Sequence, residues 1–351
     1  MTTIALDEAM PVAVERERLI YLDGWRGWAV TLVLIGHFLP IPGINLGTAG
    51  VELFFVLSGR LMAEILFVKK TPLAQFFPRR INRVYPALFV FVVSMLVVTW
   101  TTEFKVGPKA TALALVFLSN YSTWIPGFYQ TGFFDHLWSL CVEEHAYVLL
   151  ALIVLVARWR NWSPLILISI VAGAAFIDGA ASVWVFHQDY FHAYWRTDVH
   201  IGSIFVAAAI FLYLTRFRSL PSWVPVIALV AGLLLRFDDV PRPISYSLGT
   251  ALIALSVCTL DRAPAWFLAA LTNRISIYVG LISYSLYLWQ QPFYKMNEQA
   301  GLPWWAGLAA AFACGAASYY LIEKPSRGFL NRLTASLGKK SSGEPVVAPT
   351  Q

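Results

Sequence analysis

The sequence predicts an all-α membrane protein, a helical bundle of about ten transmembrane helices. Three observations point to this fold class: of the 351 residues, 58% are hydrophobic, only 13% are charged, and the mean hydropathy is +0.63. Soluble domains carry about 25% charged residues, and a soluble core of this size could not hide so large an apolar surplus. The composition therefore excludes a soluble enzyme, a disordered chain and a collagen-like chain.

Apolar segments follow one another along the chain. We expect spans at 21–41, 49–68, 84–101, 136–157, 163–182, 198–215, 221–236, 244–260, 275–294 and 304–322. The segment 110–125 is apolar but short, and we expect it to be re-entrant or interfacial. One membrane domain, 21–329, thus lies between an N-terminal segment, 1–20, and a polar tail, 330–351, which is expected to be disordered.

The basic residues predict the orientation, because Lys and Arg gather in cytoplasmic loops. With the N-terminus inside and 110–125 not crossing, the basic clusters at 69–83, 158–160 and 324–340 all face the cytoplasm. A full crossing at 110–125 would move the later clusters outside. Both termini are therefore expected in the cytoplasm. The net charge of +6 reports this topology and no nucleic-acid partner, and the three scattered cysteines indicate no metal site.

Two ionisable residues lie within the first expected span. Arg26 and His37 are eleven residues apart, which places them on one helix face, ~16 Å apart along the axis. Ionisable side chains are costly in a membrane unless they face a polar interior, and histidine is the commonest general acid or base near neutral pH. His37 is a candidate catalytic base; the alternative is a histidine that only hydrogen-bonds a neighbouring helix.

The fourth span opens with FDHLWSLCVEEHAYVLL. His136, Ser139, Glu143 and Tyr147 recur at spacings of three and four residues, so they share one helix face. Glu143 and Glu144 stand side by side in an apolar helix, where two solvated charges are hard to explain. We therefore expect at least one of them to face a polar cavity.

Basic residues also mark the cytoplasmic ends of the second and third spans. Arg60 and Glu64 are four residues apart and are expected to form an intrahelical ion pair. Arg79, Arg80 and Arg83 form a basic cluster in FFPRRINRVYPALF. Arginine stays charged and binds phosphate with two parallel hydrogen bonds, which makes the nucleotide of acyl-CoA one candidate ligand. Plain anchoring of the membrane orientation is the alternative.

One expected external loop, 184–197, reads WVFHQDYFHAYWRT and is rich in aromatic rings. Rings beside hydrogen-bonding groups suit a sugar, so Asp189 and Arg196 are candidates for binding a carbohydrate, together with His136 and Trp138 of the fourth span. An ordinary aromatic belt at the membrane interface would give the same pattern in the loop.

Taken in order, these segments resemble the acyltransferase-3 family of integral-membrane O-acyltransferases. The resemblance covers 21–329 and rests on six ordered blocks: LDGWRGWAV…GHF, GVELFFVLSG, RRINRVYPAL, HLWSLCVEE, ISYSLYLW and EKPSR. It implies that Arg26 and His37 form the catalytic signature, that the basic cluster binds the acyl-CoA donor, and that the adjacent acids of HLWSLCVEE are the family's paired acids. Some members carry a fused SGNH domain, which we do not expect in this chain.

The resemblance implies a bacterial inner-membrane O-acyltransferase. It would move an acyl group, expected to be acetyl, from acyl-CoA (acetyl-CoA) to a hydroxyl of a cell-surface or exported carbohydrate. His37 would deprotonate the acceptor, oriented by Glu143 or Glu144, and Arg26 would line the route of the pantetheine arm. No metal is expected. The alternative is a transporter or flippase for a lipid-linked glycan, which needs no histidine–acid pair; the acceptor, the acyl length and the oligomeric state stay open.

Several positions depart from the family pattern. Arg60 stands in place of an aromatic residue, Cys141 in place of Ser, and His145 in place of Gln. Gln290 replaces a common His, so no role is assigned to it. His200 replaces Arg in a TDTR-like block, a change that bears on the acceptor.

Overall fold

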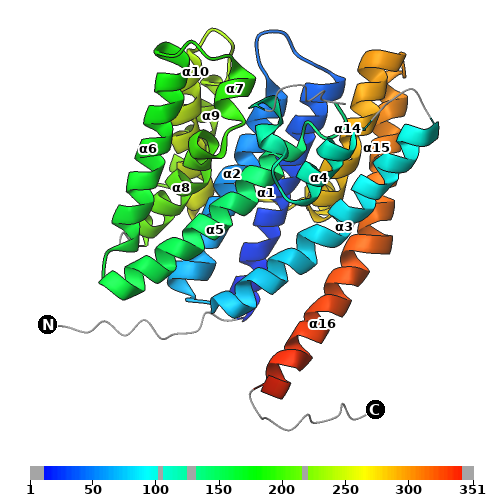
Figure 1. The fold of residues 1–351 in the computed structure, drawn as a ribbon. Helices are drawn as coiled ribbons and strands as arrows, with labels where there is room; N and C mark the ends of the chain where they lie inside the picture. Colours follow the sequence, from blue (N-terminus) through cyan, green and yellow to red (C-terminus); the bar gives the residue numbers. More distant parts are fainter. Residues whose placement is uncertain (1–11, 102–105, 125–131, 216–219, 342–351) are drawn as a thin grey trace, which may run out of the picture.

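The computed structural model describes residues 12–101, 106–124, 132–215 and 220–341. These residues form α-helices with short 3-10 and π segments, and their only β interaction is an isolated bridge between Ile44 and Phe237. The helices lie side by side in a bundle, and α16 (Lys324–Ser341) projects from its lower end in Figure 1. The predicted all-α bundle is confirmed.

The first half of the chain supplies the helices that surround the cavity described below. In order they are α1 (Val12–Phe38), α2 (Leu46–Ala63), η1 (Glu64–Val68), α3 (Leu73–Thr101), α4 (Pro108–Leu115), η2 (Ser119–Trp124), α5 (Leu137–Arg160) and α6 (Pro164–Trp184). Asn45 caps α2 by accepting a hydrogen bond from the Thr48 amide at 3.0 Å, and Pro164 begins α6 where its missing N–H costs nothing. Local sequence thus fixes both starts.

The second half of the chain contains shorter and more broken helices. In order they are α7 (Tyr190–Tyr194), α8 (Thr197–Leu214), α9 (Val224–Leu234), α10 (Arg242–Ile244), η3 (Ser245–Gly249), α11 (Thr250–Cys258), η4 (Leu260–Arg262), α12 (Ala265–Leu271), α13 (Arg274–Leu281), α14 (Ser283–Ala300), α15 (Trp304–Ser318), η5 (Tyr319–Glu323) and α16. The expected span 275–294 is therefore two helices that meet at Ile282, and 244–260 includes a π segment.

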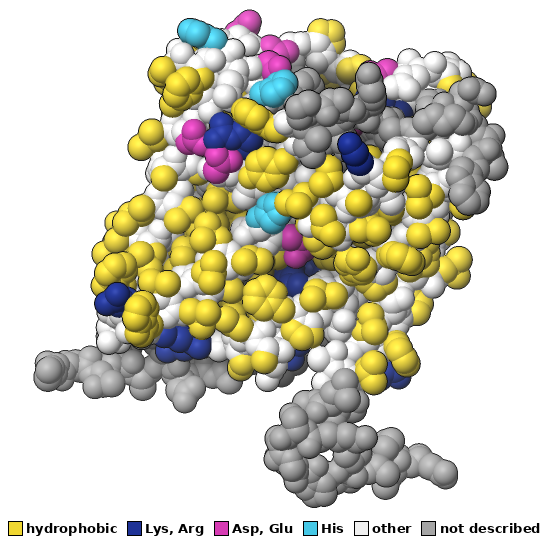
Figure 2. Space-filling model, in the orientation of Figure 1, with side chains coloured by type: hydrophobic (Ala, Val, Ile, Leu, Met, Phe, Trp, Pro, Cys, Tyr) yellow, Lys and Arg dark blue, Asp and Glu magenta, His cyan; other side chains and the backbone are white. Residues whose placement is uncertain are grey.

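The long apolar helices are those of a multi-pass membrane protein. Five described helical stretches are long and apolar enough to cross a membrane: Leu73–Thr99, Leu137–Arg160, Pro164–Trp184, Thr197–Leu214 and Trp304–Thr334. Figure 2 shows apolar side chains over most of the face that α3, α5 and α6 form, with lysine and arginine side chains along its lower edge. The total of ten spans stays a prediction.

The segment 110–125 contains no long helix in its described part. It is divided between α4, of eight residues, and η2, of six. At 1.5 Å per residue neither could cross a bilayer alone. Residue 125 lies outside the described residues, and the re-entrant or interfacial placement of this segment stays a prediction.

The ends of the chain differ from the expected domain limits. Residues 12–20 already belong to α1, and α16 continues to Ser341 through the start of the segment that the sequence predicts to be disordered. The side chain of Asn82 on α3 donates hydrogen bonds to Asn331 at 3.1 Å and to Thr334 at 3.3 Å, which ties α16 to the bundle. Residues 1–11 and 342–351 lie outside the described residues.

Glycines let α1 pack directly against neighbouring backbone. A Cβ added at Gly280 of α13 would lie 1.8 Å from the carbonyl oxygen of Asp23, and one at Gly24 would lie 1.9 Å from that of Leu271. At the other end of α1, a Cβ at Gly36 would lie 2.2 Å from the backbone nitrogen of Gly47. Because the obstacle in each case is backbone, no side chain can turn aside to make room.

We expect Gly280→Ala to destabilise the protein by at least about 1–3 kcal/mol, the usual cost of overpacking. The thermal midpoint of the detergent-purified protein and its monodispersity on size exclusion measure this loss. Gly173→Ala on α6 is the matched control, because nothing lies within 4 Å of the added Cβ. Equal thermal midpoints for the two variants would contradict the contact at Gly280.

Candidate active site

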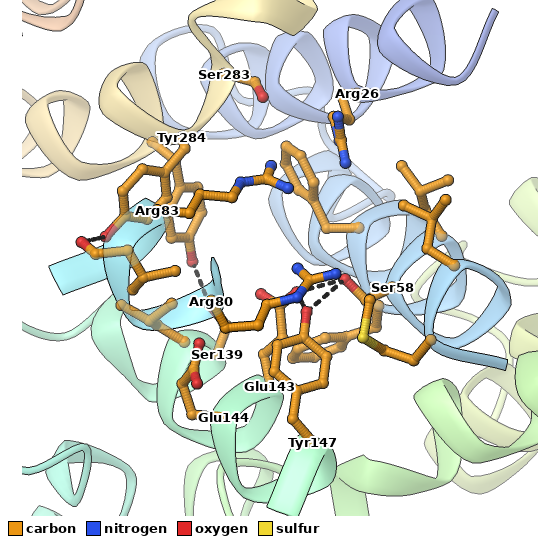
Figure 3. Close-up of a pocket in the computed structure, with 18 of the residues that line it drawn as sticks. Arg26, Ser58, Arg80, Arg83, Ser139, Glu143, Glu144, Tyr147, Ser283 and Tyr284 are labelled. Carbon is orange, nitrogen blue, oxygen red and sulfur yellow. Dashed lines mark hydrogen bonds between the residues drawn. The ribbon is translucent and has the colours of Figure 1, made fainter. Parts of the chain in front are cut away.

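A cavity opens between α1, α2, α3, α5 and α14, and we call it the central cavity. Its apolar wall comes mainly from α2, through residues such as Phe54, Phe55 and Leu61. Its polar wall is formed by side chains of all five helices: Arg26, Ser58, Arg80, Arg83, Ser139, Glu143, Glu144, Tyr147, Ser283, Tyr284 and Tyr287. Most of these are labelled in Figure 3.

Three arginines predicted to bind the donor line the central cavity. Arg80 and Arg83 come from one face of α3, and Arg26 approaches from α1 (Figure 3). The guanidinium carbon of Arg80 lies 4.9 Å from the ring centre of Tyr147, a cation–π contact that holds the side chain in place. Arg26 pairs with Asp23 at 2.9 Å. Arg79, one residue earlier on α3, is exposed and does not line the cavity.

The two adjacent acids of α5 both line this cavity but differ in their partners. Glu143 accepts hydrogen bonds from the hydroxyls of Ser58 and Tyr147. The Oε1 atom of Glu144 is buried, and no described residue donates a hydrogen bond to it. Glu144 therefore keeps a buried oxygen free to accept a hydrogen bond at the cavity.

His37 is half-buried near the end of α1 and does not line the central cavity. Its Nδ1 atom lies 2.7 Å from Oε1 of Gln290 on α14, and its ring stacks on Tyr294 with centroids 4.3 Å apart. An amide oxygen only accepts hydrogen bonds. Nδ1 therefore carries the proton, and Nε2 keeps its lone pair.

The predicted contact of His37 with the paired acids is wrong. Among the described residues, neither Glu143 nor Glu144 hydrogen-bonds His37. Gln290 has that role, and Gln290 in turn donates to Gln291 at 3.4 Å. The physical reason is that Glu143 already accepts the hydroxyls of Ser58 on α2 and of Tyr147 on its own helix, while α14 packs directly against α1.

Tyr287 and His136 connect the central cavity with the surroundings of His37. Tyr287 lines the cavity, and its hydroxyl bonds to Ser139 at 2.7 Å and to the carbonyl oxygen of His136 at 2.9 Å. The His136 ring is buried 5.3 Å from the ring of Tyr287 and is near enough to His37 for their charges to interact.

The four residues predicted for the acceptor do not form one site. Trp138 is buried and stacks on Trp195 with centroids 6.0 Å apart. Arg196 pairs with Asp178 at 2.8 Å and also with Asp198. These contacts place Trp138 in the core and Arg196 in an ion-pair network at the start of α8.

The last two acceptor candidates are also apart. Asp189 pairs with His192 at 2.8 Å in the segment before α8. His136 lies near the central cavity instead, as described above. Of the four, only His136 is close to the candidate catalytic residues.

The predicted ion pair between Arg60 and Glu64 is wrong. Glu64 lies 3.4 Å from Lys69, whereas the guanidinium of Arg60 is buried 5.4 Å from the ring centre of Phe211. The regular α-helix of α2 ends at Ala63 and continues as a π segment from Glu64. The Glu64 N–H still bonds to the Arg60 carbonyl, so the backbone keeps its i,i+4 spacing there, and the two side chains turn to different neighbours.

A metal site was not predicted. In the described part of the chain, no group of three or more His, Cys, Asp or Glu side chains is arranged to hold a metal ion.

Known proteins with similar sequences are acyl-transfer proteins by name. The sequence model of one family, described as an acyltransferase domain, matches residues 19–322. The chain is 27% identical to peptidoglycan O-acetyltransferase OatA of Listeria monocytogenes, over 88% of this chain and 56% of that protein. It is 28% identical to the putative peptidoglycan O-acetyltransferase YrhL of Bacillus subtilis, over 87% and 54% respectively.

A third relative has nearly the same length. The putative membrane-bound transacylase BcsY of Komagataeibacter xylinus is 25% identical, over 93% of this chain and 88% of that protein. The chain spans about half the length of the other two relatives. No solved structure matches it.

Proposed function

Because the chain belongs to the acyltransferase family whose model matches residues 19–322, we propose that it transfers an acetyl group from acetyl-CoA to a hydroxyl of a cell-surface or exported carbohydrate. Two of the relatives are named O-acetyltransferases, which supports acetyl as the transferred group. Both names also contain peptidoglycan, which supports a carbohydrate polymer as the acceptor. The observation that carries the proposal is the central cavity, where three arginines face two acids and Tyr287 leads toward His37.

In this proposal the arginines bind the phosphates of the donor. Arg80 and Arg83 are three residues apart on one helix face, so two guanidinium groups can contact neighbouring phosphates. Arg26 faces the same space and lines the route of the pantetheine arm. Eleven residues of α1 separate Arg26 from His37, about 16 Å along the axis, which an extended pantetheine arm can cover.

In the same proposal Glu144 binds the pantetheine arm of the donor, and Glu143 holds the cavity wall in place. The arm carries two amide N–H groups, and the unpartnered Oε1 of Glu144 is placed to accept a hydrogen bond from one of them. Glu143 fixes the hydroxyls of Ser58 and Tyr147 and so keeps the wall in shape. We infer that both acids position the donor.

His37 is the base in this proposal. Its Nε2 takes the proton of the acceptor hydroxyl while the oxygen attacks the thioester carbonyl. The tetrahedral intermediate then collapses, the C–S bond breaks, and the imidazolium returns the proton to the leaving thiolate. Gln290 is a positioning residue, because its amide oxygen holds Nδ1–H and leaves Nε2 unprotonated. Transient acetylation of His37 is a second route to the same product.

The direct test uses the purified protein in nanodiscs with acetyl-CoA labelled in the acetyl group. We expect label in an added carbohydrate and one free CoA for each acetyl group transferred. The rival class, a transporter or flippase of lipid-linked glycans, predicts movement of the glycan with no label in it. Comparison of acetyl groups on surface glycans with and without the gene would identify the acceptor.

We further propose that the protein lies in a bacterial inner membrane with both termini in the cytoplasm. An impermeant maleimide applied to intact cells tests this, because Cys141 and Cys258 are buried and Cys314 is half-buried. Cysteines introduced at the exposed positions Arg79, Lys109 and Arg160 are the probes.

We expect labelling of Lys109→Cys alone, and labelling of all three variants after the membrane is permeabilised. Labelling of Arg160→Cys in intact cells would mean that the segment 110–125 crosses the membrane. Labelling of Arg79→Cys in intact cells would place the donor arginines on the wrong side for a cytoplasmic donor.

A further inference from the structure

A groove lies between η1, the C-terminal end of α5 and the start of α6, and we call it the α5–α6 groove. It holds about 330 Å³, far more than one water molecule needs. None of its lining residues lines the central cavity, and the proposed reaction does not use them. In Figure 1 the ends of α5 and α6 meet at the lower left of the bundle, where Figure 2 shows lysine and arginine side chains.

The groove has an apolar wall and a basic edge. Leu66 of η1 and Val154 and Ala157 of α5 are buried at the apolar wall. Lys70 and Arg158 are exposed at the basic edge. Arg158 follows Val154 by four residues, so it lies on the same face of α5 and about 6 Å nearer the end of the helix. The groove is therefore apolar toward the middle of the bundle and basic at its lower end.

The two basic side chains have no acidic partner. Among the described residues, no carboxylate forms an ion pair with Lys70 or Arg158, and no lining residue of the groove is acidic. Glu64, the acid of η1, lies 3.4 Å from Lys69. The edge thus carries two positive charges that an anion can contact at the same time.

The backbone at the edge also favours an anion. Lys70 has a φ angle of 49°, in the left-handed region that glycine and asparagine adopt far more readily than lysine. A lysine therefore stands where the turn alone would favour another residue. Helix α6 begins at Pro164, which lines the groove, and its N-cap residue Ser163 makes no side-chain capping bond. The N-terminus of a helix carries partial positive charge and attracts phosphate groups.

We propose that the α5–α6 groove binds one anionic phospholipid of the surrounding bilayer. Its phosphate lies between Lys70 and Arg158, and the upper part of one acyl chain lies against the apolar wall. A soluble phosphate compound would use the basic edge alone and leave the apolar wall uncovered, so the wall favours a lipid. Trp162, 56% exposed beside the groove, suits the headgroup region, where tryptophan is enriched.

Native mass spectrometry of the detergent-purified full chain tests the groove, with phosphatidylglycerol and phosphatidylcholine of identical acyl chains as probes. Both lipids carry a phosphate, but only phosphatidylglycerol has a net negative charge for the two basic residues. We expect phosphatidylglycerol to bind at least about tenfold more tightly. Equal affinity for the two lipids would overturn the proposal.

Soluble phosphate compounds separate a lipid site from a general phosphate site. Glycerol 1-phosphate and acetyl-CoA carry phosphate groups but no diacylglycerol, so they cannot cover the apolar wall as a lipid does. We expect neither to displace bound phosphatidylglycerol when it is added at the same concentration as the lipid. Displacement by either compound would show a site for soluble phosphates and would overturn the assignment to a lipid.

Paired substitutions locate the site. Lys70→Asn combined with Arg158→Gln should abolish the preference for phosphatidylglycerol, and asparagine tolerates the left-handed backbone at position 70. Arg160→Gln combined with Lys324→Gln is the matched control, because it removes two exposed basic side chains that do not line the groove. The control should keep the preference. Thermal midpoints of both double variants verify that they are folded.

Two results with these variants would contradict the proposal. Equal losses in both double variants would show a general attraction between basic side chains and anionic lipid, with no particular site. A full preference in the folded Lys70 and Arg158 variant would place the lipid elsewhere. The result is also independent of the proposed reaction: a protein that prefers phosphatidylglycerol but transfers no acetyl group keeps the lipid groove and refutes only the acetyl transfer.

Discussion

Replacement of His37 by Gln should lower the rate of acetyl transfer by about 10²–10⁴-fold, the usual loss when a positioned base is removed. An amide at this position can still hydrogen-bond Gln290, but it has no nitrogen that accepts a proton near neutral pH. The affinity for acetyl-CoA should stay unchanged, because His37 lies outside the central cavity. The measurement is the transfer rate and donor affinity of folded protein in nanodiscs.

The matched control is His187→Gln, which changes an exposed histidine and should keep the wild-type rate. A rate for His37→Gln within about tenfold of wild type would fall below the range for a lost base. It would leave His37 as a histidine that only joins α1 to α14.

Gln290→Leu tests whether Gln290 positions His37, the proposed base. It should lower the transfer rate without changing donor affinity, because the Nδ1–H of His37 loses its acceptor. The double variant with His37→Gln should be no slower than His37→Gln alone, since the two residues act through one proton transfer. Additive losses would contradict that role.

Replacement of Arg80 or Arg83 by Ala should weaken acetyl-CoA binding by about 10- to 150-fold, because one charge-assisted phosphate contact contributes about 1.5–3 kcal/mol. Both side chains face the central cavity (Figure 3). Isothermal titration of the purified protein gives the affinity. The loss should shrink at high salt, where the wild-type contact is itself weakened.

Arg79→Ala is the control that the chain itself offers, since Arg79 is exposed on the same helix. It should bind acetyl-CoA as the wild type does. Equal losses in all three variants would show a general effect of positive charge, and no loss in any of them would leave the arginines as topology anchors. Dephospho-acetyl-CoA lacks one phosphate. For this ligand, the Ala substitution of the arginine that contacts the missing phosphate should cost less affinity than it does for acetyl-CoA.

Much of the central cavity could be predicted from sequence, because its polar residues lie in short motifs. Helical spacing alone puts Arg80 and Arg83 on one face, and the adjacent acids of α5 indicate a polar cavity. The same reasoning missed Gln290 as the partner of His37. These residues are 253 positions apart, and the contact depends on how α14 packs on α1, which helical periodicity does not encode.

The buried contact between Glu52 and His200 shows the same limit. Glu52 and His200 are 148 positions apart, and each alone reads as a polar residue in an apolar helix. The i,i+4 rule predicted a partner for Arg60 and was wrong: the backbone spacing is kept, but Glu64 pairs with Lys69 and the Arg60 guanidinium packs on Phe211. The acceptor residues were predicted from composition, which carries no information on distance.

The glycine contacts around α1 limit how the bundle can move. At Gly24 and Gly280 at one end of α1, and at Gly36 at the other, where it meets the backbone of Gly47, backbone meets backbone with no room for a Cβ. If α1 slid or rotated, residues with side chains would enter those contacts, so α1 should stay fixed against α2 and α13. Rocking of two halves about this interface, the motion of an alternating-access carrier, is therefore blocked here. In the proposed reaction the acyl group therefore travels along a static scaffold, carried by the mobility of its own pantetheine arm.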